Sequence, residues 1–158
     1  MSSAHSSDSA APREGRLLGL DVGDVRIGVA VSDPLGIIAQ PHQVVQRTTL
    51  DRDLAALLDI AADREAVGIV VGMPLNQHGQ PGLQAGKVQA FIDALRALTP
   101  LPILTIDERF TTALAQRALI AADVSRKGRR KVVDKIAAQQ ILQTYLDRRA
   151  RERVDRRP

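Results

Sequence analysis

The chain has 158 residues, of which 44% are hydrophobic and 25% charged, with no cysteine and a net charge of +4 at pH 7. This length is enough for one domain with its own core, and the composition excludes wholesale disorder, disulfides and thiolate metal sites. No apolar run reaches the roughly 20 residues of a membrane-spanning helix. We therefore expect a cytoplasmic protein without a membrane partner.

The charge is distributed unevenly along the chain. Residues 1–124 hold ten Lys or Arg and fourteen Asp or Glu, whereas residues 125–158 hold twelve and four, so the net charges are −4 and +8. This asymmetry indicates an anionic partner, in the first place a nucleic-acid backbone. A solvated tail explains the last twelve residues equally well. We expect a disordered Ser- and Ala-rich tail over residues 1–15, one domain over 16–148 and a basic tail over 149–158.

Apolar patterning predicts the elements in chain order. Alternating or continuous apolar runs predict strands at Leu17–Val22, Ile27–Ser32, Gln43–Arg47, Val67–Gly72 and Pro102–Glu108. Helical periodicity and capping residues predict helices at Leu50–Arg64, Leu83–Leu98, Thr111 or Thr112 to Ala122, and Val133–Arg148. The basic segment Ser125–Lys131 is expected to form a loop between the last two helices. The order predicts an α/β fold, a mixed central sheet of a hairpin plus parallel strands flanked by helices, with the first strand central.

Acidic residues stand at unusual positions in this pattern. Asp21 ends the first strand, Asp107 and Glu108 end the last one, and Asp134 begins the inward face of the last helix. Oxygen-only clusters of this kind suit hard cations such as Mg²⁺ or Mn²⁺. A pair of such ions can orient an attacking water and stabilise the leaving oxygen in phosphodiester hydrolysis. A cation would also neutralise the charge of a buried Asp21.

Each acid also has a purely structural interpretation. Asp134 could stabilise the helix N-terminus through the macrodipole, and Asp21 could accept backbone N–H groups from the Gly23 turn. Alternation places Asp107 and Glu108 on opposite faces of their strand, but the sequence alone does not decide which face is which. The hypothesis of a metal site therefore depends on the convergence of three acids.

Four segments together resemble a known family. LLGLDVGDVRIGVAVSD, VVGMPLNQHG, IDERFTT and DKIAAQQIL resemble, in order and spacing, the motifs of the YqgF family, also called RuvX, a Holliday junction resolvase-like family. The resemblance covers Leu17 to Leu146. It implies an RNase H-like fold and a metal-dependent cytoplasmic nuclease that matures the 5′ end of pre-16S ribosomal RNA, in ribosome biogenesis. Kinship to the RuvC resolvases implies the alternative of a junction-cleaving DNA nuclease.

The resemblance also assigns residues. It implies that Asp21, Glu108 and Asp134 are the catalytic, metal-binding acids. Residues of the matching segments look like phosphate or substrate contacts: Arg26, Asn76, Arg109 and Thr112. The charge pattern adds the basic residues that precede Asp134 as a nucleic-acid-binding group: Arg126, Lys127, Arg129, Arg130 and Lys131. Val25 departs from the family pattern, which usually has a polar residue there.

Two other classes of protein remain open at this point. The first segment also resembles the phosphate-binding hairpin of the actin, sugar-kinase and Hsp70 ATPases, but those proteins close two such domains around ATP and this chain has room for one. The basic end alone would also suit a non-catalytic RNA-binding protein or transcription factor. The sequence does not decide between structured RNA and branched DNA as the partner, nor whether the protein is a homodimer.

Overall fold

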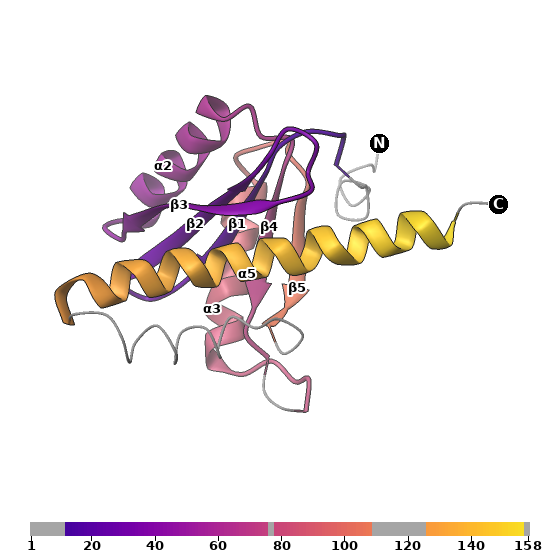
Figure 1. The fold of residues 1–158 in the computed structure, drawn as a ribbon. Coiled ribbons are helices and arrows are strands. Elements are labelled where there is room, and N and C mark those ends of the chain that lie inside the picture. Colours follow the sequence, from indigo (N-terminus) through magenta and orange to yellow (C-terminus); the bar gives the residue numbers. More distant parts are fainter. Residues whose placement is uncertain (1–11, 76–77, 109–125, 157–158) are drawn as a thin grey trace.

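A mixed five-stranded sheet forms the centre of the fold (Figure 1). The structure, a computed structural model, describes residues 12–75, 78–108 and 126–156, and within the last range it describes side chains from residue 133 onward. The order is β3-β2-β1-β4-β5. The strands are β1 (Leu17–Val22), β2 (Arg26–Ser32), β3 (Ala39–Gln46), β4 (Gly68–Met73) and β5 (Ile103–Asp107). β1 pairs antiparallel with β2 and parallel with β4, so its predicted central position is confirmed.

Helices cover both faces of this sheet. α2 (Leu50–Asp63) and α3 (Leu83–Arg96) pack on one face, and α5 (Arg126–Asp155) crosses the other (Figure 1). Thr49 caps α2 by accepting a hydrogen bond from the Arg52 N–H at 3.2 Å. Alternate residues of β1 supply both cores: Leu18 and Leu20 lie under α2 and α3, whereas Leu17 packs with α5.

Glycines let α5 lie directly on the sheet. A Cβ built at Gly19 would stand 2.6 Å from the Cβ of Leu142, and one built at Gly28 would overlap the Asp134 carbonyl. Gly72 on β4 faces Ile141 in the same way. Gly19 and Gly28 therefore cannot be replaced by a larger residue without a shift of α5, whereas at Gly72 the obstructing atom is the movable end of the Ile141 side chain.

The structure corrects three predicted boundaries, the two ends of α5 and the start of β3. The segment predicted as a basic loop is helical from Arg126 onward, and α5 continues to Asp155 rather than ending at Arg148. Lys, Arg, Glu, Gln and Ala are good helix formers, and Gly128 alone opposes them by only about 1 kcal/mol. β3 begins at Ala39 and includes Pro41, which an edge strand tolerates.

The remaining predicted strands and helices begin and end within a residue or two of the observed ones. The predicted helix from Thr111 or Thr112 to Ala122 lies outside the described residues. Within the residues described, none of the helices has both the length and the apolar character needed to cross a membrane.

Candidate active site

Asp21 lies near the carboxyl end of β1, on the face that α5 covers. It pairs in register with Gly28 of β2, and it has the same parity along the strand as Leu17 and Gly19, which contact or pack with α5. Its position is partly buried. The strand register therefore places Asp21 on the side of the sheet that α5 covers.

Glu108 lies on the same side of the sheet as Asp21. The residue directly follows β5 and is 8% exposed. Its Cγ would stand 3.2 Å from a Cβ at Gly72, next to the Ile141 side chain of α5. Asp107 pairs with Met73, whose side chain packs against the core under α2 and α3. The geometry thus places Glu108, rather than Asp107, on the face that carries Asp21.

Asp134 joins this face from the helix side. Its Oδ2 accepts a 2.7 Å hydrogen bond from Nε of Arg26, and both side chains of this ion pair are mostly buried. Arg26 starts β2 two residues before Gly28, where α5 comes closest to the strand. The predicted substrate contact Arg26 is therefore a partner of the predicted metal ligand Asp134.

The donor chemistry of these acids fits a hard cation, since only carboxylate oxygens are offered. As they stand, however, no three His, Cys, Asp or Glu side chains within the described residues are grouped as a metal site. The pair with Arg26 occupies Oδ2 of Asp134. One carboxylate oxygen can bind a basic side chain while the other binds a metal, as second-shell partners of metal ligands do.

Several predicted substrate contacts fall outside this geometry. Asn76, Arg109 and Thr112 lie outside the described residues. The backbone of five predicted basic contacts lies in the first turns of α5: Arg126, Lys127, Arg129, Arg130 and Lys131. Their backbone leads directly to Asp134.

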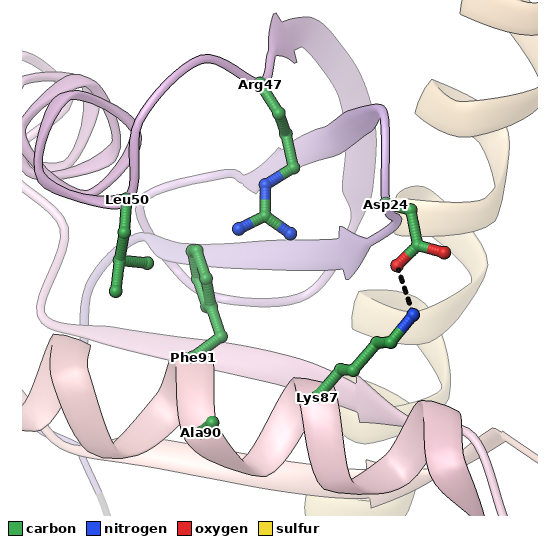
Figure 2. A pocket seen from close by; sticks show the side chains of 6 residues that line it. All are labelled: Asp24, Arg47, Leu50, Lys87, Ala90 and Phe91. Atoms are coloured by element: carbon green, nitrogen blue, oxygen red, sulfur yellow. Dashed lines mark ion pairs between the residues drawn. The ribbon is translucent and has the colours of Figure 1, made fainter.

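Sequence reasoning missed a buried ion pair close to this end of the sheet. Asp53 of α2 is 2% exposed and accepts hydrogen bonds from Nε of Arg47 at 3.1 Å and from the Thr48 N–H at 2.9 Å. A signal was present, because Asp53 stands next to Leu54 and four residues before Leu57, on the apolar side of α2. Arg47 also lines a pocket beside the β1–β2 turn, which Figure 2 shows.

Two solved structures with a similar architecture are Holliday junction resolvases. RuvC of Thermus thermophilus in complex with a Holliday junction substrate matches with a TM-score of 0.56 at 18% identity, over 86% of this chain and 96% of that one. The yeast mitochondrial Holliday junction resolvase Ydc2 matches with a TM-score of 0.57 at 14% identity, over 96% and 86%. At such identities the likeness shows the fold alone, which is the RNase H-like fold of the resolvases.

Sequence comparison identifies the family. The family described as "RuvX: Holliday junction resolvase" matches residues 15–148. A relative from Desulforamulus reducens is 51% identical over 132 residues, covering 84% of this chain and 96% of that protein, and one from Paracoccus denitrificans is 50% identical over 139 residues, covering 88% of each. Both carry the name "Putative pre-16S rRNA nuclease". The chain belongs to the RuvX family.

Proposed function

We propose that the protein is a metal-dependent nuclease that hydrolyses phosphodiester bonds of structured RNA in the 5′-end maturation of pre-16S rRNA. The observation that carries the proposal is the strand register, which puts Asp21 and Glu108 on the face where α5 brings in Asp134. The names of relatives at about 50% identity support the reaction and the substrate. Membership of the family supports the nuclease class.

Asp21, Glu108 and Asp134 are the residues that would hold Mg²⁺ or Mn²⁺. When bound, such ions lower the pKa of water and stabilise a leaving oxygen. Arg26 is a positioning residue: its Nε fixes Oδ2 of Asp134, which would leave Oδ1 of that carboxylate as the oxygen for a cation. Burial of Glu108 excludes water from that carboxylate, which strengthens its attraction for a cation.

Contacts with nucleic acid fall to basic and polar residues of the segments that resemble the family and of the first turns of α5. We assign this role to Asn76, Arg109, Thr112, Arg126, Lys127, Arg129, Arg130 and Lys131. The last five precede Asp134 on the same helix, so a phosphate bound by them would lie close to Asp134. Contacts of this type position the backbone and do not read base sequence.

The test is cleavage with Mn²⁺ or Mg²⁺ of three substrates: an RNA containing the 5′ end of pre-16S rRNA, a Holliday junction and a linear DNA duplex. Asp21→Asn should lower cleavage of the RNA by at least about a hundredfold, because removing a group that stabilises the transition-state charge has effects of this size. Asp107→Asn is the matched control, one residue before Glu108 but on the other face, and should keep activity. Isothermal titration with Mn²⁺ should show binding that Asp21→Asn weakens.

Other outcomes would decide between the alternatives. Cleavage of the junction but not of the RNA would assign the protein to the junction resolvases. Binding of RNA without cleavage under any metal condition would make it a non-catalytic RNA-binding protein. Equal loss in Asp21→Asn and Asp107→Asn would contradict the assignment of the acids to one face.

A further inference from the structure

An open pocket lies across the β1–β2 turn from the acids. It has a volume of about 630 Å³. Its walls are Asp24 of the turn, Arg47 directly after β3, Leu50 at the start of α2, and Lys87, Ala90 and Phe91 of α3 (Figure 2). Asp24 follows Asp21 by three residues, so the pocket opens at the same end of the sheet as the acids but on the face covered by α2 and α3. Its volume is in the range of pockets that bind small organic groups.

The guanidinium of Arg47 is held in place within this pocket. Its Nε pairs with Asp53 at 3.1 Å, its Nη1 donates to the Gly23 carbonyl at 3.0 Å, and its Cζ lies 5.2 Å from the centre of the Phe91 ring. Figure 2 shows the group above Phe91 and facing the pocket. Because Asp53 and Phe91 already fix the side chain, little conformational entropy remains to be lost when a ligand contacts it.

The other walls combine apolar surface with one loosely paired cation. Leu50 is 44% exposed and stands on the side of Arg47 away from Lys87 (Figure 2). Lys87 and Asp24 are both exposed, and the 3.5 Å pair between them is of a type that contributes little. The ammonium of Lys87 can therefore exchange Asp24 for a phosphate, while Asp53 already balances the charge of Arg47.

We propose that this pocket binds one unpaired nucleotide of the RNA substrate, next to the bond that is cut. The base packs against the Arg47 guanidinium and Leu50, and its phosphate pairs with Lys87. Guanidinium groups stack on unpaired RNA bases, and the flat aromatic face of a base matches the Arg47 and Leu50 walls better than a phosphate alone. The proposal rests on the proposed function, to which it adds a preference for a single-stranded flank beside the cleavage point.

The experiment measures binding in EDTA, so that no cleavage is needed. Three labelled hairpin RNAs are compared by fluorescence anisotropy: one with an unpaired flank, one with the same flank base-paired, and one with an abasic flank that keeps the phosphates. Leu50→Ser removes an exposed apolar wall at the first residue of α2. Leu98→Ser is the control, because Leu98 is 56% exposed and follows the far end of α3.

Wild type should bind the unpaired flank about tenfold more tightly than the abasic flank, since stacking of one base has effects of this order. Leu50→Ser should lose this preference with an unchanged salt slope, whereas Leu98→Ser should keep it. Lys87→Gln should reduce the magnitude of the salt slope by about 0.7 with the unpaired flank, the change for one phosphate of a single strand. Equal binding of all three RNAs by wild type, or an equal loss with all three RNAs in Leu50→Ser, would overturn the proposal.

Cleavage kinetics separate this proposal from the proposed function. If the wild type cuts the RNA and Leu50→Ser cuts it with the same KM, the pocket proposal fails and the nuclease stands. If the wild type cuts no substrate but binds the unpaired flank preferentially, and this preference depends on Leu50, the proposed nuclease function is refuted and the proposed nucleotide-binding pocket is supported.

Discussion

Gly28→Ala tests the close approach of α5 to β2, on which the position of Asp134 depends. A Cβ at residue 28 would overlap the Asp134 carbonyl oxygen and stand 2.6 Å from the carbonyl carbon. Ordinary contact begins at 3.4 Å, so the carbonyl carbon alone requires the helix to move by about 0.8 Å, and the nearer oxygen requires more. The obstructing atoms belong to the backbone and cannot rotate away.

The magnitude follows from what lies between α5 and the sheet. Ala137, Ala138, Ile141 and Leu142 are completely buried there, and a gap of 0.5 to 1 Å removes a quarter to a half of the dispersion energy at each contact. Overpacking of a core typically lowers the free energy of unfolding by 1 to 3 kcal/mol, and we expect about 3 kcal/mol here because rigid backbone is involved. The corresponding fall in Tm is about 6 to 12 °C.

Urea unfolding followed by circular dichroism measures this difference. The control is Gly86→Ala, at a helical position of α3 where an added Cβ meets nothing within 4 Å. It should raise the free energy of unfolding by about 0.4 to 1 kcal/mol by restricting the unfolded chain. If Gly28→Ala unfolds at the same urea concentration as wild type, α5 does not lie on β2 as described and the approach of Asp134 to Arg26 loses its basis.

Two further predictions concern carboxylates outside the proposed active site. Asp53→Asn should lower the free energy of unfolding by about 2 kcal/mol, since a buried acceptor of Arg47 loses its charge; Asp51→Asn, exposed in the same turn, should leave urea unfolding unchanged, and equal effects would contradict the role of Asp53. The Ile38 N–H makes the largest contribution to holding the pKa of Asp33 below its ordinary value of 3.8, and together with the smaller contributions of the Ile37 and Leu35 N–H groups it outweighs the opposing effect of desolvation. This stabilisation is present above that value and is lost as the pH falls through the folded-state pKa. The difference in urea midpoint between wild type and Asp33→Asn should therefore shrink from about pH 6 to about pH 3, and a constant difference would refute it.

Strong local patterns made most of the fold predictable. The short apolar run LLGLDV before the Gly23–Asp24 turn predicted a strand, and the stripe of Leu54, Leu57 and Ala61 in α2 predicted a helix. The start of α5 was predicted wrongly because RKGRRK contains no apolar residue and therefore shows no helical periodicity. Its helix is detectable only from propensity, a weaker signal than periodicity.

The candidate site was predictable in composition but not in arrangement. The acids at strand ends identified the edge of the sheet, because such ends converge in a layered fold. The choice between Asp107 and Glu108 required knowledge of which face α5 covers, which Gly72 and Ile141 reveal only in three dimensions. The pocket could not be predicted from the sequence either, because Asp24, Arg47 and Lys87 come from three separate segments that meet only in the folded protein.

The β1–β2 turn connects the acids and the pocket mechanically. Arg47 binds the turn twice, through its backbone N–H to the Val25 carbonyl at 2.9 Å and through Nη1 to the Gly23 carbonyl at 3.0 Å. The same turn is closed by the Gly23 N–H, which donates to the carbonyl of Arg26, the partner of Asp134. The proposed nucleotide packs against the Arg47 guanidinium without displacing it, so these hydrogen bonds remain when the pocket is occupied. Removal of the guanidinium by substitution would release the Nη1 bond to Gly23 but keep the backbone bond to Val25, so the turn between Asp21 and Arg26 would lose one of its two bonds to Arg47.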